Sequence, residues 1–189
     1  MILFLSRINW IKGLDFLIES FYELTKYRSD IILVIVGKDE GYKSKLDALI
    51  NNLGISDKIL FTGFLSGDEK LSALVDADVL VQTSVYEHGT GTPFEAILCN
   101  TAVIVTKHTG SGENINKING GYLVEYGNKN ELRDLIQYIL NNPAEAQAKT
   151  QKAKEYIKNN LSISTRIKEY ENLYRVCIAQ NKVLEEYKK

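Results

Sequence analysis

The feature that most constrains the fold is a series of short, nearly continuous apolar stretches separated by segments with helical periodicity. Each stretch is rich in Ile, Val and Leu and lacks the alternation of apolar and polar residues seen in half-exposed strands. Such stretches are typical of parallel strands that helices cover on both faces. Five are predicted to be strands: Ile2–Ser6, Ile31–Gly37, Ile59–Gly63, Val79–Gln82 and Ala102–Thr106. A sixth, short edge strand is predicted in "GYLVEYG", residues 121–127.

The segments between these stretches carry apolar residues at the spacing of amphipathic helices. After the first stretch, for example, Leu14, Leu17 and Phe21 fall on one helical face. Helices are predicted in residues 13–27, 43–54 and 67–77, from about Pro93, in residues 130–142, from Pro143, and from about Ser164 to Tyr187. The alternation predicts an α/β fold, a Rossmann-like parallel sheet with helices on both faces.

Length and charge narrow the class of protein. The 189 residues are enough for one sizeable domain, and the net charge of -1 gives no basic footprint for nucleic acid. Two cysteines, Cys99 and Cys177, form no disulfide framework and suit a reducing compartment. The opening apolar run ends at Arg7, too early for a signal peptide, and no run is long enough to cross a membrane. We therefore expect a single cytoplasmic domain over residues 1–189.

The loop after the fourth predicted strand, "SVYEHGTGTPFEAILCN", carries glutamates at both ends of a nearly bare segment. Glu87 and Glu95 bracket seven residues that include Gly89 and Gly91. Ligands of open α/β sheets bind beyond the carboxyl ends of the strands. The glycines let backbone amides approach an anion, and the following helix adds a favourable dipole. Ionised carboxylates accept hydrogen bonds from hydroxyl groups. The loop therefore suits phosphates between two hydroxylated rings, as in a nucleotide sugar.

Each glutamate also has a purely structural interpretation, which the sequence leaves open. Thr92, Pro93 and Glu95 have the spacing of a capping box, with proline at the first helical position. Glu87 also fits a solvated loop residue.

Two cations follow the first predicted strand, on the same rim of the sheet. Arg7 and Lys12 could neutralise a diphosphate leaving group and the charge that develops as a glycosidic bond breaks. Taken locally, each is also compatible with a solvated surface charge.

The glutamate loop resembles the E-x7-E motif of retaining glycosyltransferases of family 4, which have the GT-B fold. "FLSRINWIKGLDFLIESF" is similar to the opening strand, basic loop and first helix of that family, and the resemblance continues through "ADVLVQTSVYEHGTGTPFEAILCNTAVIVTKHTGSGE". It implies the C-terminal, donor-binding lobe of an enzyme that transfers a sugar from a nucleoside diphosphate sugar with retention of configuration. No metal or other cofactor is implied.

The resemblance also assigns roles to individual residues. It implies that Glu87 contacts the donor sugar, Glu95 the ribose, and Arg7 and Lys12 the diphosphate, so that Glu87, Arg7 and Lys12 are the catalytic candidates. The remaining expected donor contacts are Gly89, Thr90, Gly91 and Thr92 in the motif, His88 beside the sugar, Phe64 and Leu65 at the base, and Gly110 and Glu113 in the Gly-containing loop "TGSGEN".

One departure affects the middle of the motif. Family members usually have an aromatic residue and a glycine at its third and fourth positions, where this chain has Gly89 and Thr90. The assignment of individual amides to phosphate or sugar oxygens therefore does not carry over.

The resemblance implies partners as well. The donor would be a UDP- or GDP-sugar, the acceptor a glycan or glycolipid, and a separate N-terminal acceptor-binding domain would complete an enzyme that is cytoplasmic and membrane-peripheral. The fragment alone should be inactive. The last helix carries an apolar stripe that either packs on its own sheet or contacts that domain: Ile167, Tyr170, Tyr174, Cys177, Ile178 and Leu184.

Other classes fit less well. A dehydrogenase lobe needs G-x-G-x-x-G, yet the first loop offers only Gly13 and Phe94 stands where a third glycine would follow Gly91. A phospho-receiver domain needs acidic residues where Arg7 stands. A GT-B-like epimerase or phosphorylase lobe, or a non-catalytic nucleotide-binding module, remains open.

Overall fold

The computed structural model describes residues 1–89 and 91–186, with side chains through residue 180. The chain forms two compact units, Met1–Lys154 and Glu155–Lys189. The first unit contains the whole sheet and every residue proposed above for the site that the structure describes.

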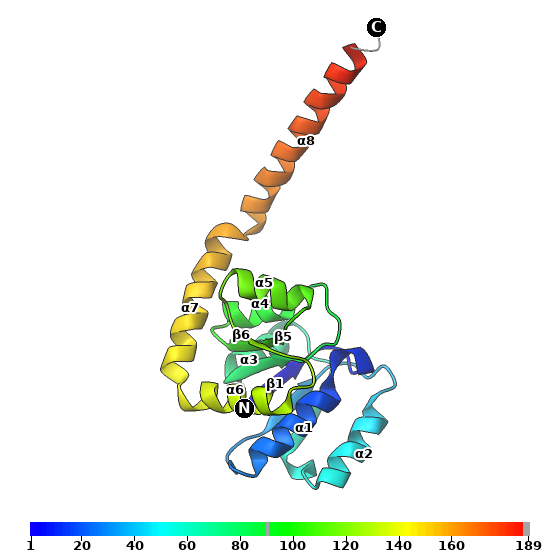
Figure 1. The fold of residues 1–189 in the computed structure, drawn as a ribbon, viewed down its shortest axis with the longest axis vertical. Helices are drawn as coiled ribbons and strands as arrows, with labels where there is room; N and C mark the ends of the chain where they lie inside the picture. Colours follow the sequence, from blue (N-terminus) through cyan, green and yellow to red (C-terminus); the bar gives the residue numbers. More distant parts are fainter. Residues whose placement is uncertain (90, 187–189) are drawn as a thin grey trace. The chain divides into compact units, whose positions relative to one another are not determined.

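The first unit is built on a six-stranded parallel sheet in the order β3-β2-β1-β4-β5-β6 (Figure 1). The strands are β1 (Ile2–Leu5), β2 (Leu33–Val36), β3 (Ile59–Gly63), β4 (Val79–Gln82), β5 (Ala102–Thr106) and β6 (Tyr122–Val124). All six predicted strands are present, and β6 forms an edge as expected. The prediction of a Rossmann-like α/β fold is confirmed.

The order of the strands places the topological switch point of the sheet, called the crevice below, between β1 and β4. Ile2 of β1 pairs with Leu33 of β2 on one side and with Val79 of β4 on the other. From β1 the chain moves outward to β2 and β3 and then returns across the sheet to β4. The chain therefore leaves β1 for α1 on one face of the sheet and β4 for α4 on the other, which makes this boundary the usual ligand site of an open α/β sheet.

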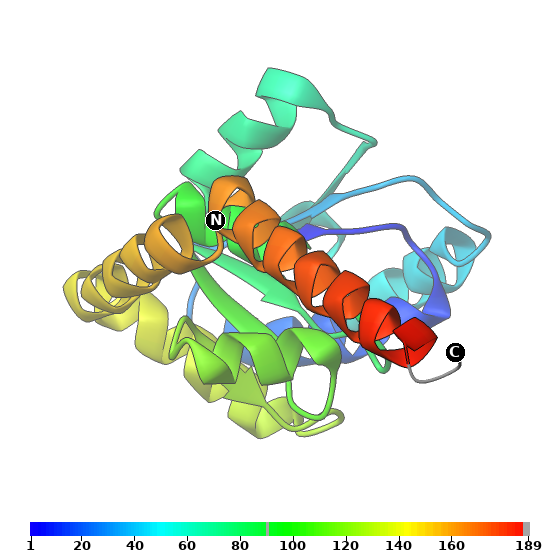
Figure 2. The same ribbon diagram turned by 90° about the horizontal axis from the view of Figure 1, so that it is seen from above.

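Helices cover both faces of the sheet. Helices α1, α2 and α6 lie on one face, and α3, α4 and α5 lie on the other (Figures 1 and 2). The helices of the first unit are α1 (Leu14–Thr25), α2 (Lys43–Leu53), α3 (Gly67–Asp76), α4 (Gly91–Leu98), α5 (Gly110–Lys117), α6 (Lys129–Asn141) and the greater part of α7 (Pro143–Asn160).

The core lies beneath α1 and α6. Phe4 of β1 joins one buried cluster with Leu17 and Phe21 of α1 and Ile136 of α6, and all four side chains are at most 1% exposed. Such packing leaves the strand ends as a fixed support, so the loops that follow them are positioned by the sheet.

The expectation that all five apolar runs are covered on both faces is wrong for β3. This strand lies at the edge of the sheet, and Leu60, its second residue, is 50% exposed. Ile59 and Phe61 are partly buried against the core. Apolar composition alone did not distinguish an edge strand from a central one.

The segment "TGSGEN" begins helix α5 and is not a loop. Thr109 caps the helix, because its hydroxyl accepts a 3.0 Å hydrogen bond from the backbone N–H of Gly112. Glycines lower helix propensity and so hid the helix in the sequence. Gly112 is needed for packing, since a Cβ there would come within 2.3 Å of the Thr106 carbonyl oxygen.

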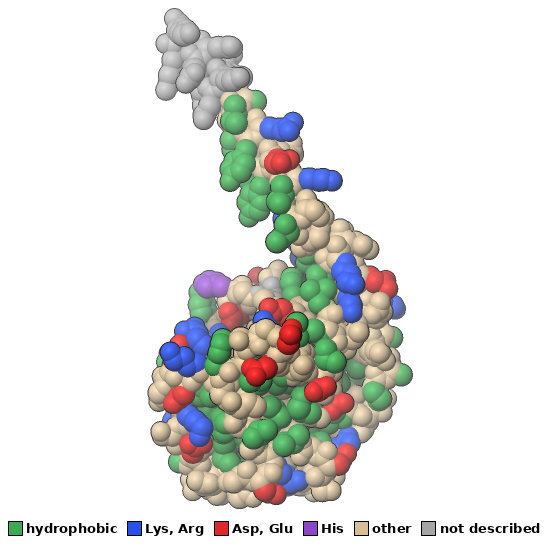
Figure 3. All heavy atoms as spheres, turned by 180° about the vertical axis from the view of Figure 1, so that it is seen from behind, with side chains coloured by type: hydrophobic (Ala, Val, Ile, Leu, Met, Phe, Trp, Pro, Cys, Tyr) green, Lys and Arg blue, Asp and Glu red, His purple; other side chains and the backbone are tan. Residues whose placement is uncertain are grey.

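The second unit consists of the end of α7 and helix α8 (Ile163–Glu186), which corresponds to the last predicted helix. The Ile167, Tyr170, Tyr174 and Ile178 side chains are each more than half exposed. Figure 3 shows apolar side chains gathered along one side of this helix. Cys177 is also exposed, whereas the Leu184 side chain lies outside the described part. None of the described helices is both long and apolar enough to cross a membrane.

Candidate functional site

The loops that follow β1 and β4 are joined by direct contacts. The Val85 N–H donates a 2.8 Å hydrogen bond to the Ile11 carbonyl, and the buried Thr83 hydroxyl donates one of 2.9 Å to the Gly13 carbonyl. Gly13 has a φ of 62°, and a Cβ at this position would lie 2.1 Å from the Thr83 carbonyl oxygen. Only glycine fits here. The close approach fixes the basic loop against the glutamate loop.

This contact brings together two of the three catalytic candidates. Lys12 ends a short 3-10 helix (Trp10–Lys12), and its Nζ lies 2.5 Å from Glu87 Oε2. The Lys12 residue is 7% exposed and the Glu87 side chain 19%. The pair lies at the crevice between β1 and β4, as the positions of both residues after parallel strands had indicated.

The Glu87 carboxyl is held in its charged form. Burial acts to raise its pKa, but the hydrogen bond and positive charge of Lys12, helped by the backbone amides of Gly89 and His88, lower the pKa below the usual 4.5. At neutral pH Glu87 is therefore an acceptor only.

Arg7 lies on the same rim but turns toward a different carboxylate. Its Nη1 donates a 2.9 Å hydrogen bond to Glu40, which follows β2 and also accepts from Asn9 Nδ2 at 2.8 Å. The Arg7 side chain is 63% exposed. The structure thus places Lys12, and not Arg7, against Glu87.

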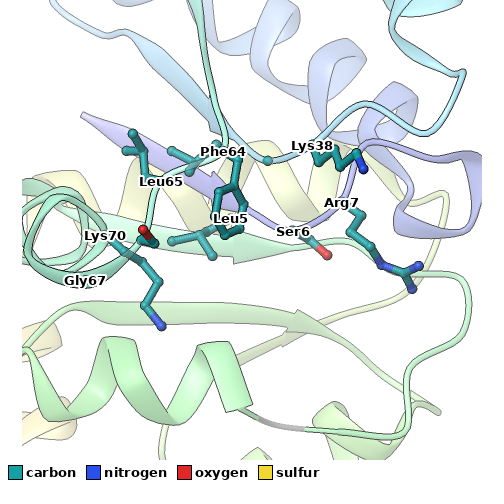
Figure 4. A pocket seen from close by; sticks show the side chains of 11 residues that line it. Leu5, Ser6, Arg7, Lys38, Phe64, Leu65, Gly67 and Lys70 are labelled. Carbon is teal, nitrogen blue, oxygen red and sulfur yellow. The ribbon is translucent and has the colours of Figure 1, made fainter.

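A hollow of about 470 Å³ opens beside Arg7, at the carboxyl ends of β1 and β2 and between β3 and α3 (Figure 4). Phe64 and Leu65, the residues expected at the base, are among those that line it. The lining is largely apolar near Leu5 and these two residues, and it is cationic at Arg7, Lys38 and Lys70. A flat, apolar group attached to an anion matches this distribution.

The second motif glutamate is also paired with a lysine. Glu95 accepts two hydrogen bonds from Lys70 Nζ, of 2.9 and 3.0 Å. Figure 4 shows the Lys70 side chain extending from α3 toward α4, the helix that carries Glu95. The sequence did not single out Lys70, because nothing local indicates that α3 and α4 lie side by side.

The alternative interpretation of Thr92 and Glu95 as a capping box, which the sequence left open, does not agree with the structure. Helix α4 already includes Gly91, so Thr92 lies within its first turn, and the Glu95 carboxylate is bonded to Lys70. Glu95 is therefore directed out of its own helix, toward the edge of the hollow.

The glutamate loop is held against the start of α5. The Gly110 N–H donates a 2.6 Å hydrogen bond to the Glu87 carbonyl, and the Ser111 hydroxyl donates to the Gly89 carbonyl. A Cβ at Gly110 would lie 2.4 Å from the His88 carbonyl oxygen. Gly110 thus lies against the motif.

The other expected donor contacts differ in their surroundings. His88 Nε2 and the Tyr86 hydroxyl form a 2.6 Å hydrogen bond on the exposed rim, and Glu113 is exposed on α5. A Cβ at Gly89 or Gly91 would meet nothing within 4 Å, so these glycines leave open space next to the backbone. Thr90 lies outside the described residues.

Besides Lys70, a second polar residue of the site was not predicted. Gln82 ends β4, is 7% exposed, and places Nε2 3.5 Å from Glu87 Oε2. Its position within an apolar strand was the available signal.

Comparison with known proteins assigns the chain to a family. The family described as "Glycosyl transferases group 1" matches residues 1–160, so the chain belongs to it. Among its relatives, the 2-deoxystreptamine glucosyltransferase of Streptomyces kanamyceticus is 28% identical over 160 residues, which are 85% of this chain and 41% of that protein. An uncharacterised glycosyltransferase of Methanocaldococcus jannaschii is 30% identical over 188 residues, covering 94% of this chain and 45% of its own length. The chain thus spans less than half the length of these relatives.

Solved structures show the same fold. A glycosyltransferase of Rickettsia africae superposes with a TM-score of 0.81 at 25% identity, over 94% of this chain and 47% of that one. HepE of Anabaena, solved in complex with UDP, gives a TM-score of 0.81 at 21% identity, over 92% and 48% of the two chains. The Rossmann-like sheet is that of one lobe of a GT-B glycosyltransferase.

Proposed function

We propose that this chain is the donor-binding, C-terminal lobe of a retaining glycosyltransferase of family 4. The observation that carries the proposal is the Lys12–Glu87 ion pair at the crevice between β1 and β4. It joins a cation of the kind that binds phosphate to a carboxylate of the kind that binds sugar hydroxyls, at the place where this fold binds ligands.

The geometry suggests how the parts of a donor would be divided along the rim. The base would enter the hollow beside Phe64 and Leu65, and Glu95, next to Lys70, would meet the ribose. The diphosphate would lie near Arg7 and Lys12, and the sugar beside Glu87. The order base, ribose, diphosphate, sugar is the covalent order of a nucleotide sugar.

The chemistry of transfer needs stabilisation of the departing diphosphate. Lys12 and Arg7 supply two positive charges, and the buried setting of Lys12 makes its charge more effective than it would be in water. Following the family resemblance, we propose that these side chains, together with loop amides, act without a bound metal ion.

The ligands of a structural neighbour support one choice of donor nucleotide. HepE of Anabaena has been solved with UDP and with UDP-glucose. We propose a UDP-sugar as the first candidate donor and a GDP-sugar as the second.

A second lobe would complete the enzyme. This chain spans less than half the length of its relatives, and we propose that an N-terminal lobe binds a glycan or glycolipid acceptor and closes over the donor. The exposed apolar stripe of α8 is the surface we assign to contact with that lobe. We place the enzyme in the cytoplasm, peripheral to a membrane, and expect the 189 residues alone to bind donor without transferring sugar.

Ligand binding tests the proposal directly. Saturation-transfer NMR with UDP, UDP-glucose, GDP and GDP-mannose, and with NADH and acetyl phosphate as controls, should show binding of one diphosphate and its sugar nucleotide. Preferential binding of NADH or of acetyl phosphate would contradict the proposal. Turnover measured alone and with a supplied N-terminal lobe then tests the division of labour, and transfer by the isolated chain would show that one lobe suffices.

A further inference from the structure

Gln82 occupies a position where an apolar side chain would serve the fold better. It follows Val79, Leu80 and Val81 in β4, and all four residues are buried. Gln82 pairs in register with Val105 of β5 at the carboxyl edge of the sheet. A buried amide is costly unless its polar atoms find partners, so its presence calls for an explanation.

The amide of Gln82 is only partly paired. Nε2 faces Glu87 Oε2 at 3.5 Å, whereas Oε1 is buried and has no hydrogen-bond partner among the described residues. Exchanging the two amide atoms would direct the oxygen at a carboxylate, and two acceptors repel each other. The charge on Glu87 thus selects the observed orientation.

Unpaired polar atoms are concentrated at this crevice. In the part of the chain whose side chains are described, five buried side-chain polar atoms lack a hydrogen-bond partner. Three of them belong to Asn9, Gln82 and Ser84, in or next to the loops after β1 and β4. These groups lie where the ligand site is proposed, and a buried polar group without a partner in a folded protein needs an explanation.

The donors around Glu87 are distributed unequally between its two oxygens. Lys12 Nζ and Gln82 Nε2 both face Oε2, while among the described residues Oε1 accepts a 3.3 Å hydrogen bond from the Gly89 N–H. Each carboxylate oxygen can accept about two hydrogen bonds. Oε1 therefore retains capacity for a hydroxyl of the ligand, and the donors on Oε2 keep the carboxylate from rotating.

We infer that Gln82 is a positioning residue that holds Glu87 in the orientation required to bind the donor sugar. This inference rests on the proposed function. Lys12 would also bind the diphosphate, so the phosphate oxygens of a bound donor compete with the Glu87 carboxylate for the Lys12 ammonium group. Gln82 is neutral and does not compete for phosphate, so its amide keeps the carboxylate in place once Lys12 is shared with the ligand.

The test is a double-mutant cycle read out by ligand selectivity. Gln82→Met preserves length and removes both polar amide atoms, and Gln137→Met on α6 is the matched control. Affinities would be measured for UDP and UDP-glucose and for GDP and GDP-mannose, and the pair that the parent binds would be followed. We expect Gln82→Met to weaken the sugar nucleotide at least threefold and the bare diphosphate less than twofold, with no fall in melting temperature. In a Glu87→Gln background the same change should have no further effect.

Each other outcome overturns the inference. Equal weakening of both ligands, or a lower melting temperature without selective loss, would show a purely structural role. Unchanged affinities would show no role, and additive effects in the cycle would show that Gln82 does not act through Glu87. If the parent binds none of the four ligands, the proposed function fails and this inference fails with it.

Discussion

Lys12 Nζ and Glu87 Oε2 lie 2.5 Å apart and join two loops separated by 75 residues of sequence. The lysine proposed for the diphosphate is thus paired with the carboxylate proposed for the sugar. Binding a nucleotide sugar would replace an internal ion pair by two external contacts, one for each partner. The two side chains should therefore be energetically coupled.

Replacing Lys12 should weaken diphosphate binding selectively. A charge-assisted hydrogen bond contributes about 1.5–3 kcal/mol, so Lys12→Met should lower the affinity for UDP or GDP by about tenfold or more and leave nucleoside binding unchanged. Lys117→Met, at an exposed position on α5, is the control. The single tryptophan, Trp10, is 64% exposed and two residues from Lys12, so its fluorescence can follow the titration. Equal diphosphate affinity in variant and parent would remove Lys12 from the site.

The two motif glutamates should give different ligand profiles. Glu87→Gln should weaken the sugar nucleotide and spare the diphosphate, whereas Glu95→Gln should weaken both because both contain ribose. The Lys70–Glu95 pair is partly exposed, so Glu95→Gln should change stability by less than about 1 kcal/mol. Glu19→Gln, which breaks a comparable exposed pair with Lys129 on the other face of the sheet, is the control. Calorimetric titration distinguishes these profiles, and identical profiles for the two variants would contradict the assigned roles.

Substitution of two glycines of the site should distinguish a role in packing from a role in ligand contact. Gly110→Ala places a methyl group against the His88 carbonyl, and overpacking of this kind costs about 1–3 kcal/mol. Gly89→Ala meets open space and should alter stability by less than about 0.5 kcal/mol while still weakening the sugar nucleotide. Thermal unfolding and titration of both variants check this. Unchanged affinity in Gly89→Ala would show that no ligand atom approaches that amide closely.

Acid should destabilise the fold partly through Glu87. Its pKa is lowered in the folded state, so the pair contributes stability that is present above the usual pKa of 4.5 and is lost as pH falls through the lower folded pKa. Urea unfolding from pH 7 to pH 3 should therefore show a shallower acid loss in Glu87→Gln than in the parent. Glu113→Gln, on an exposed part of α5, should keep the parental slope. Parallel curves for all three proteins would contradict the strength of the Lys12–Glu87 pair.

The first unit should bind donor without α8. Every described site residue lies between Arg7 and Glu113, and the family match ends at residue 160. A chain shortened after Asn160 should therefore retain the parental affinity for diphosphate and sugar nucleotide within about twofold. Loss of binding in a shortened chain that still unfolds cooperatively would show that α8 contributes to the site.

The sheet could be predicted from the sequence because buried parallel strands appear as short, nearly continuous apolar runs. Runs such as Leu33–Val36 and Ala102–Thr106 are apolar on both faces, and the positions of Lys12 and Glu87 after such strands were enough to place them on one rim. Helix α5 was not predicted because it contains Gly110 and Gly112, and glycine has a low helix propensity. Both glycines are required by close packing against neighbouring backbone, and this packing outweighs the helix propensity.

Contacts between side chains of different elements could not be predicted from the sequence. The capping-box interpretation of Glu95 followed from local spacing, whereas its actual partner, Lys70, comes from a helix that only the sheet order brings near. The contact of Gln82 with Glu87 was likewise not predicted, because the sequence shows Gln82 only as the end of a strand. Such pairs depend on distances across the fold, and no local pattern encodes them.

The strand order also determines when during synthesis a binding site can exist. Strands β1, β2 and β3 leave the ribosome before β4 and are neighbours in the sheet, but β4 must then pair with the other side of β1. Long-range pairing of this kind is slow, because a long loop must close before any contact forms. A nascent chain that ends before Glu87 carries Lys12 without its partner. Nucleotide binding would therefore report the moment at which the second half of the sheet docks on the first, which makes the ligand a folding probe.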